Sequence, residues 1–267
     1  MRDGADKMYM TEYLKMMRVK EWIKFFTLIP LIGAILAHAT PAVLILVGVI
    51  FFCVIGYGFV INNYFDVEID RRNTKKVMKG NNPLSTGEVT KKGTLVLMSL
   101  LLVIAIALSC FLTLTGLLFT LLSILFLTLY SVKYIRIKER FIADIITHGM
   151  MFGLFPFLAG FTLAGGNLNT VVLLIASLFM IIGCESLLTH QINDYREDFG
   201  NSSTTVVRVG LKSGWALLGL FVLLSIANLE LTVHCSDIGT MLHGGAFAYL
   251  TAYPVYTCRS EILDVLL

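Results

Sequence analysis

Four long stretches of the chain contain neither lysine nor arginine, and this pattern constrains the fold more than any other feature. All 21 basic residues lie outside the stretches 25–70, 93–132, 141–195 and 213–258. Each stretch is long enough for two helices of about 20 residues, the length that crosses a hydrocarbon core. A helical hairpin enters and leaves on the same side of a bilayer. The pattern therefore predicts four hairpins with every basic residue on one face.

The composition agrees with a bundle of membrane helices. The chain is 57% hydrophobic and 15% charged, whereas soluble domains carry about 25% charged residues. We therefore expect an all-α membrane protein of about eight transmembrane helices, with the basic face and both termini in the cytoplasm. A net charge of +3 gives no reason to expect a nucleic-acid partner. The expected helices cover residues 22–38, 43–65, 92–109, 112–132, 141–163, 170–193, 212–231 and 238–257.

A polar pattern occurs twice in the chain. Residues 62–70 read NNYFDVEID at the end of the second expected helix, and residues 190–198 read HQINDYRED at the end of the sixth. Both fit polar-x-x-x-Asp-x-x-x-Asp. We expect one transmembrane domain, 1–267, built from two four-helix repeats at about 14–138 and 139–260. Membrane proteins built from repeats often place their functional site where the repeats meet.

The spacing of these polar residues indicates a metal site. Asn62, Asp66 and Asp70 recur every four residues, so they share one face of a helix, and Asp194 and Asp198 share a face of another. Two carboxylates at this spacing repel each other, and a cation would compensate for the repulsion. Mg²⁺ prefers oxygen ligands and typically binds one or two carboxylates together with substrate phosphates. A solvated helix end is the alternative for either motif taken alone.

The two motifs resemble the signatures of the UbiA superfamily of intramembrane prenyltransferases. Residues 62–70 are similar to N-D-x-x-D-x-x-x-D, and residues 81–87, NNPLSTG, to the N-R-P-[LI]-x-x-G that follows it in the family. Residues 194–210 are similar to the second D-x-x-x-D with its Gly and Thr-rich continuation. Residues 18–24, RVKEWIK, are similar to the R-P-x-x-W-x-K of many members. The resemblance spans about residues 14–215.

The chain departs from the family pattern in three respects. Asn63 stands where the family usually has Asp, outside the three-residue stripe, so we expect little effect. Asn82 stands where Arg is usual, which removes a cation from the phosphate side and puts the usual role of that loop in doubt. The family typically has nine helices, one more than we count.

The resemblance implies an Mg²⁺-dependent transfer of a polyprenyl group from a polyprenyl diphosphate through an allylic carbocation. The expected partners are the polyprenyl diphosphate, an acceptor and membrane lipid. An aromatic quinone precursor is the favoured acceptor, and a glycerol-phosphate lipid precursor or another acceptor is the alternative. The implied metal ligands are Asn62, Asp66, Asp70, Asp194 and Asp198. Their four aspartates are also the expected catalytic residues, together with Lys138 and Tyr134.

Further residues are candidates for substrate contacts. Lys138 is carried over from the family as a phosphate contact, with Tyr134 as its companion. Glu185 and His190 are candidates for the acceptor, since an ionisable side chain inside a membrane span is a functional suspect. A hydrogen bond between helices is the alternative for Glu185, and membrane topology alone would account for the cations. The candidate diphosphate-binding cations are Lys24, Arg71, Arg72, Lys138 and Arg208.

Other classes of protein compete with this interpretation. A transporter fits the repeats and the acids within the helices, but these acids gather near one membrane face and transporter sites lie near the midplane. A CDP-alcohol phosphotransferase would need a D-G-x-x-A-R run that the sequence lacks. A non-catalytic lipid-binding relative, or a cyclase or phosphatase variant of the same fold, stays open. Asp144 and His148, four residues apart, would line the cavity or form a local pair.

Overall fold

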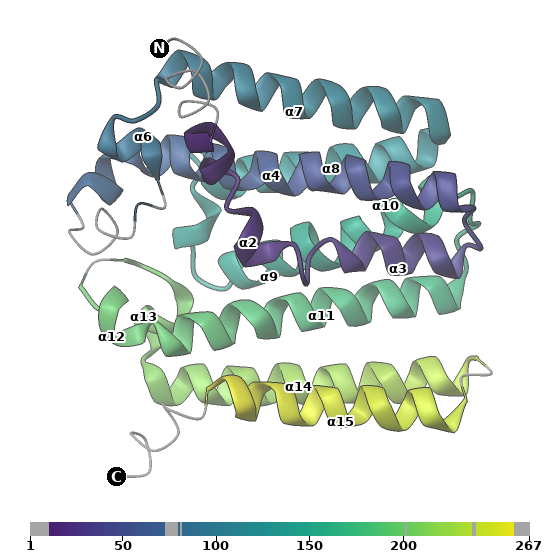
Figure 1. The fold of residues 1–267 in the computed structure, drawn as a ribbon. Coiled ribbons are helices and arrows are strands. Elements are labelled where there is room, and N and C mark those ends of the chain that lie inside the picture. Colours follow the sequence, from purple (N-terminus) through teal and green to yellow (C-terminus); the bar gives the residue numbers. More distant parts are fainter. Residues whose placement is uncertain (1–10, 73–79, 81, 201, 237–238, 259–267) are drawn as a thin grey trace. The chain divides into compact units, whose positions relative to one another are not determined.

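All the regular secondary structure among the residues that the computed structural model describes is helical (Figure 1). It divides into two compact units, which we describe separately. The first comprises Met1–Ile135 and Pro156–Gly166, and the second comprises Arg136–Phe155 and Asn167–Leu267. The described residues are those of the chain apart from 1–10, 73–79, 81, 201, 237–238 and 259–267.

The first unit is organised around one long helix. Its elements are α2 (Val19–Trp22), α3 (Leu28–Leu36), α4 (Pro41–Arg72), α6 (Pro83–Thr86), α7 (Lys91–Leu112), α8 (Leu114–Ser131) and most of α10 (Phe155–Leu163). Helix α4 packs against α3, α7 and α8. Most of its apolar segment is buried (61%), whereas only 22% and 28% of the apolar segments of α7 and α8 are buried. Helix α4 is therefore the centre of this unit, and the first polar motif lies at its end.

Helices α3 and α10 pack closely through glycines. A Cβ atom on Gly160 would lie 1.9 Å from the Pro30 carbonyl oxygen, and one on Gly33 would lie 2.4 Å from the Phe157 carbonyl oxygen. Small residues allow backbones to approach in this way in membrane proteins, where packing replaces the hydrophobic effect between helices. Only glycine fits at these two contacts, so they fix α10 against α3.

The second unit is built around α11. Its elements are η1 (Ile137–Glu139), α9 (Ala143–Gly149), the π-helical turn η2 (Met150–Leu154), α11 (Thr170–Asn193), α12 (Tyr195–Asp198), α13 (Thr205–Val209), α14 (Leu211–His234) and α15 (Thr240–Thr257). Helix α11 packs against α9, η2 and α14, and α15 packs against α14. Ile145, Leu188, Ile192 and Leu218 are buried in a shared core. This core holds the end of α11, which carries the second polar motif.

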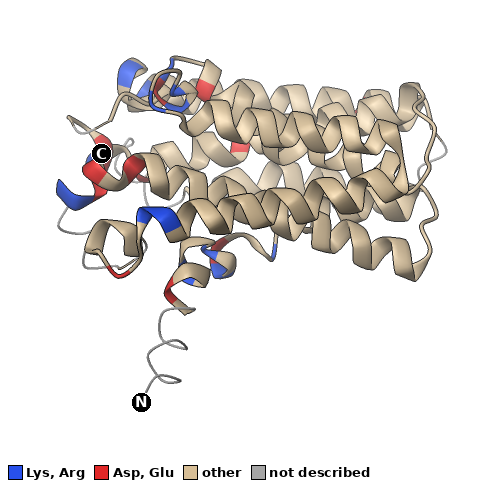
Figure 2. Cartoon of the chain, turned by 90° about the horizontal axis from the view of Figure 1, so that it is seen from above, with Lys and Arg blue, Asp and Glu red and all other residues tan. Residues whose placement is uncertain are grey.

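Six segments of the described chain are long and apolar enough to cross a membrane. Lysine and arginine lie on loops and helix ends, and the long helices are free of them along most of their length (Figure 2). This arrangement confirms the predicted all-α class, and the total of eight spans stays a prediction. The six segments are Pro41–Arg72, Lys91–Leu112, Leu114–Ser131, Ala143–Leu163, Thr170–Asn193 and Leu211–His234.

The first two expected helices differ from those in the structure. The helix predicted over 22–38 is interrupted, because α2 ends at Trp22 and α3 begins at Leu28. Pro30 lies in the first turn of α3, where its missing N–H costs nothing, and a helix continuing from upstream would clash with its ring. The helix predicted over 43–65 instead continues to Arg72. The first motif is therefore wholly helical.

The repeat halves predicted at about 14–138 and 139–260 do not coincide with the two compact units. Pro156–Gly166, which includes most of α10, belongs to the first unit, although it falls in the second predicted half. The reason is the close packing of α10 on α3. The span from α9 through η2 to α10 thus begins in one unit and ends in the other.

Candidate active site

The first polar motif forms a stripe along the last turns of α4. Asp66 and Asp70 are only 8% and 7% exposed, and Asn62, one turn earlier, is half-buried. The stripe is continuous because α4 extends beyond its apolar segment without a break. Two buried carboxylates one turn apart are costly unless hydrogen bonds or a cation compensate for their charge. The structure therefore keeps these three residues on one face of α4, and their binding of a metal stays a prediction.

Asn82 contacts this stripe from the loop that follows α4. Its side-chain nitrogen Nδ2 donates to Asp70 Oδ2 at 2.8 Å and to the Asn63 carbonyl oxygen at 2.9 Å. Asn63 in turn donates from its own Nδ2 to the Met16 carbonyl oxygen at 3.0 Å. The loop thus still contacts the acidic stripe, although it carries Asn82 where the family usually has Arg. The two substituted positions, Asn63 and Asn82, thus take part in one buried network.

The short helix α6 holds Asn82 in position. The Ser85 hydroxyl and the Ser85 N–H both donate to the Asn82 carbonyl oxygen, at 2.7 Å and 2.9 Å. Arg71 donates from Nε to the Ser85 carbonyl oxygen at 2.9 Å. Arg71 therefore fastens α6 to the end of α4, a role that the sequence did not indicate. Arg72 and Lys24 are exposed.

The second polar motif lies on an interrupted helix. Helix α11 ends at Asn193, Asp194 adopts φ −90° and ψ 0°, and α12 begins at Tyr195. The Asp198 N–H still donates to the Asp194 carbonyl oxygen at 2.9 Å, so the four-residue spacing survives the interruption. Both aspartates are half-buried. This motif is more open than the stripe on α4.

His190 lies beside the second motif. Its Nε2 is 3.2 Å from Asp194 Oδ2, and its side chain is exposed. The histidine can therefore orient this carboxylate. Glu185, by contrast, is 1% exposed within α11, and its Oε1 has no hydrogen-bond partner among the residues that the structure describes. Ser225 of α14 is its neighbour within this unit.

Asp144 joins three elements of the second unit. Its carboxylate accepts hydrogen bonds from the Thr205 N–H at 2.9 Å, from the Thr205 hydroxyl, and from Gln191 Nε2 at 2.8 Å. The Ile145 N–H donates to it as well, at 2.8 Å. Gln191 Oε1 accepts from the Val206 N–H at 3.1 Å. The fully buried Asp144 thus fastens α13 to α9 and α11.

This network was not predicted from the sequence. Asp144 was expected to line the cavity or to pair with His148, whose Nδ1 instead lies 2.9 Å from the Gly183 carbonyl oxygen. The partners Asp144 and Thr205 are 61 residues apart, and no local pattern indicates such a contact. The polar Gln191 on an otherwise apolar face of α11 was the available signal.

Arg208 and Lys138 lie at the outer edge of the same network. Arg208 donates from Nε to the Ser203 carbonyl oxygen at 2.9 Å and from Nη2 to the Glu139 carbonyl oxygen at 2.7 Å. It therefore connects α13 with η1, which carries the half-buried Lys138. In the first unit, the Tyr134 side chain is 92% exposed.

We expect Asp144→Asn to loosen α13. An asparagine would turn one donor group towards the Thr205 N–H or the Gln191 amide, and a buried donor without a partner costs about 1–3 kcal/mol. Hydrogen exchange followed by mass spectrometry should show faster exchange in residues 202–209 than in the wild type. Ser203→Ala, an exposed change in the same segment, is the control. Unchanged exchange in Asp144→Asn would refute this role.

The oxygen-rich stripe on α4 suits a hard divalent cation. Asp66, Asp70 and Asn62 provide two carboxylates and an amide. Asn82 Oδ1 is a buried oxygen that has no hydrogen-bond partner within the described part of the chain. Mg²⁺ selects such ligands and retains several waters. Among the described residues, no three His, Cys, Asp or Glu side chains gather closely enough to hold a metal by themselves. Each motif would therefore need ligands from elsewhere, such as phosphate oxygens.

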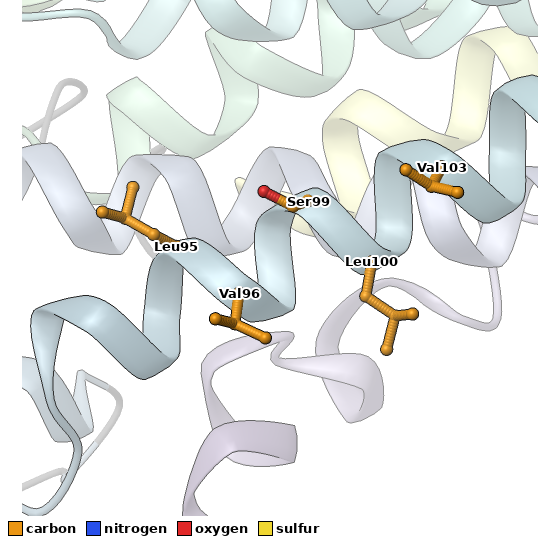
Figure 3. Close-up of a pocket in the computed structure, with 5 residues that line it drawn as sticks. All are labelled: Leu95, Val96, Ser99, Leu100 and Val103. Carbon is orange, nitrogen blue, oxygen red and sulfur yellow. The ribbon is translucent and has the colours of Figure 1, made fainter.

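Two cavities in the first unit lie away from this stripe. One of about 310 Å³ is lined by Tyr57, Ile61 and Phe65 of α4, together with residues of α7 and α8. These three side chains lie at least about 100° around α4 from Asp66, since successive residues turn by about 100°. The other, a shallow groove of about 390 Å³, is formed by exposed residues of α7 (Figure 3). Both are suited to lipid chains.

Solved structures with this fold are known. The structure of a UbiA homolog from Archaeoglobus fulgidus bound to DMAPP and Mg²⁺ matches with a TM-score of 0.80 at 17% identity. The match covers 92% of this chain and 86% of that one. A digeranylgeranylglyceryl phosphate synthase structure matches with a TM-score of 0.71 at 21% identity, over 96% and 88% of the two chains. The chain therefore shares the fold of these two proteins.

The sequence identifies the family directly. The UbiA prenyltransferase family model matches residues 25–261, and the chain belongs to this family. The digeranylgeranylglyceryl phosphate synthase of Methanocaldococcus jannaschii is 30% identical over 212 residues, which are 76% of this chain and 67% of that protein. The synthase of Methanococcus aeolicus is 29% identical over 205 residues, 76% and 68% of the two proteins. The protein is therefore a prenyltransferase, and the transporter alternative is wrong.

Proposed function

We propose that the protein transfers a geranylgeranyl group to a geranylgeranylglyceryl phosphate and so makes digeranylgeranylglyceryl phosphate. The observation that carries this proposal is the agreement among the curated relatives, three of which are synthases of that product. The sequence favoured an aromatic quinone precursor as the acceptor. The relatives support the alternative, a glycerol-phosphate lipid precursor.

The proposed reaction exchanges one carbon–oxygen bond for another. The allylic carbon of the geranylgeranyl group leaves the diphosphate oxygen, and the acceptor hydroxyl oxygen forms an ether bond to that carbon. Diphosphate and the hydroxyl proton are released. The enzyme must therefore stabilise the negative charge that develops on the departing diphosphate, and it must hold an anionic acceptor nearby.

The two polar motifs are proposed to bind the metal and the diphosphate. Bound Mg²⁺ would neutralise the charge of the leaving group. The buried Asp66 and Asp70 offer one face of oxygen ligands on α4, and the more open second motif offers another set. In each motif the two neighbouring carboxylates repel each other unless a cation compensates for their charge. The proposed metal-binding residues are Asn62, Asp66, Asp70, Asp194 and Asp198.

Basic side chains are proposed to bind the phosphate groups. The two substrates together carry a diphosphate and a phosphate monoester, and Lys and Arg neutralise such groups. The backbone contacts of Arg71 and Arg208 use only part of their five N–H donors. The positive-inside rule supports a cytoplasmic location for these basic side chains. The proposed set is Lys24, Arg71, Arg72, Lys138 and Arg208, with Tyr134 as the companion of Lys138.

His190 is the better of the two acceptor candidates. Its exposed ring lies beside Asp194, so an acceptor hydroxyl that reached the motif would meet it. Glu185 lies nine residues earlier in α11, roughly 13 Å along the helix axis, and is buried within its own unit. We propose that His190 contacts the acceptor and that Glu185 acts at most on its apolar chain.

An acceptor panel tests the proposal. The purified protein in detergent, with geranylgeranyl diphosphate and Mg²⁺, is offered geranylgeranylglyceryl phosphate, glycerol phosphate and two aromatic acids that serve as quinone precursors. We expect diphosphate release and an ether product, identified by mass spectrometry, with geranylgeranylglyceryl phosphate. The initial rate with each aromatic acid should be at least about 10⁴-fold lower, because a site that pairs with a polar substrate group strongly rejects analogues lacking it.

Each alternative has its own signature in this panel. A prenylated aromatic product would show that the acceptor is an aromatic quinone precursor. Tight Mg²⁺-dependent binding of geranylgeranyl diphosphate without release in any reaction would favour a non-catalytic relative.

A further inference from the structure

We propose that Asn82 belongs to the metal site, with its side-chain oxygen accepting a hydrogen bond from a water molecule on the Mg²⁺ held by Asp70. This inference rests on the proposed function and adds a residue to it. Asn82 lies outside both polar motifs, and its presence in place of the family's Arg put the usual role of this loop in doubt. The structure instead gives it two contacts to the motif and one unused acceptor.

The orientation of the Asn82 side chain follows from its hydrogen bonds. Its Nδ2 contacts Asp70 Oδ2 at 2.8 Å and the Asn63 carbonyl oxygen at 2.9 Å. Both partners are acceptors when Asp70 is ionised, so only the nitrogen can face them. The oxygen Oδ1 must then take the other position. The assignment of the amide is therefore fixed by two independent contacts.

Asn82 Oδ1 is buried without a donor. The residue is 5% exposed, and this oxygen has no hydrogen-bond partner in the part of the chain that the structure describes. Buried polar atoms of native proteins are nearly always paired, so an exception calls for an explanation such as a water or an ion. A ligand that brings a donor to this point would complete the network.

The position of Oδ1 suits water on a bound metal ion. The two polar atoms of an amide share one carbon, so Oδ1 lies within a few ångströms of Asp70 Oδ2. Mg²⁺ retains several of its waters when carboxylates bind it, and such waters are hydrogen-bond donors. Asn82 would thus serve twice, since Nδ2 orients the Asp70 carboxylate and Oδ1 accepts from the water. Partners of this kind orient the direct ligands of a metal.

Metal binding can be measured without turnover. Mn²⁺ replaces Mg²⁺ as the probe, and its free concentration is followed by electron paramagnetic resonance in the presence of an unreactive thiolodiphosphate analogue of geranylgeranyl diphosphate. We expect Asn82→Leu, which keeps the size and removes both contacts, to weaken Mn²⁺ binding by about 10- to 100-fold. Ser85→Ala is the matched control, because it removes a hydrogen bond of the same turn and leaves the Asn82 amide intact. Its Mn²⁺ affinity should stay within about twofold of the wild type.

Asn82→Asp separates the two contacts. It keeps an acceptor oxygen and loses the donor, so it should bind Mn²⁺ more tightly than Asn82→Leu. Equal losses in both variants would overturn the acceptor role, and wild-type affinity in Asn82→Leu would overturn the whole inference. An equal loss in Ser85→Ala would show that Asn82 acts only by shaping the turn, which also overturns it. A wild-type protein that binds no Mn²⁺ with the diphosphate analogue would instead refute the proposed function.

Discussion

Asp66→Asn is expected to lower kcat by about a thousandfold. Asp66 is in the middle of the stripe on α4 and is 8% exposed, so its carboxylate would hold a cation at a place that is largely shielded from bulk solvent. Removing one preorganised charge-stabilising group typically costs about 10²–10³ in kcat. A variant that also loses a metal ligand should lie at the upper end of that range. The rate is measured as diphosphate release at saturating geranylgeranyl diphosphate.

Glu68→Gln provides the control on the same helix. Glu68 is two residues from Asp66, its side chain is 70% exposed, and it lies 3.9 Å from Lys133. An exposed ion pair of this kind contributes little, so this variant should keep wild-type kcat. Both proteins should elute as the same species in detergent with the same helical circular dichroism. Wild-type turnover in Asp66→Asn would remove the stripe from the site.

Asp194→Asn is expected to lower kcat by roughly 10²–10³-fold. Its carboxylate is half-buried, with the exposed His190 as a neighbour 3.2 Å away, so it is more open to solvent than the buried carboxylate of Asp66. The smaller expected effect relative to Asp66 follows from this difference. The apparent affinity for Mg²⁺ should fall together with kcat, which a Mg²⁺ titration of the rate would show.

His190→Ala distinguishes a metal ligand from its neighbour. A residue that orients a carboxylate and contacts the acceptor should raise KM for the acceptor and lower kcat by less than about tenfold, because only one hydrogen bond of roughly 1 kcal/mol is lost. Equal losses in His190→Ala and Asp194→Asn would mean that the histidine itself is essential. Undiminished activity in Asp194→Asn would exclude the second motif from the reaction.

The sequence predicted the helices well because one physical rule governs their composition. Charged residues are expelled from a hydrocarbon core, so the gaps between basic residues mark the spans. The same rule says nothing about where a helix stops once it leaves the membrane. For this reason the extension of α4 to Arg72 and the interruption before Leu28 were missed. Both depend on local backbone chemistry and packing.

The candidate site was predictable to the extent that its residues are periodic. The four-residue spacing of Asn62, Asp66 and Asp70 made them recognisable in the sequence, and the structure keeps them on one face of α4. Asn82 and Asp144 have no such period. Their partners come from other elements, and only folding brings Asn82 to Asp70 or Asp144 to Thr205. Comparison with the family pattern suggested that Asn82 only removes a cation from this loop. Its contacts instead make it part of the hydrogen-bond network around Asp70.

The packing of α10 on α3 limits where the protein could be divided into two separately produced fragments. A cut in the loop before residue 136 would separate α4, α7 and α8 from α10, which packs on α3 through Gly33 and Gly160. The N-terminal fragment would then expose the surface of α3 on which α10 packs in the whole protein. The two fragments would have to be produced together for either to fold fully.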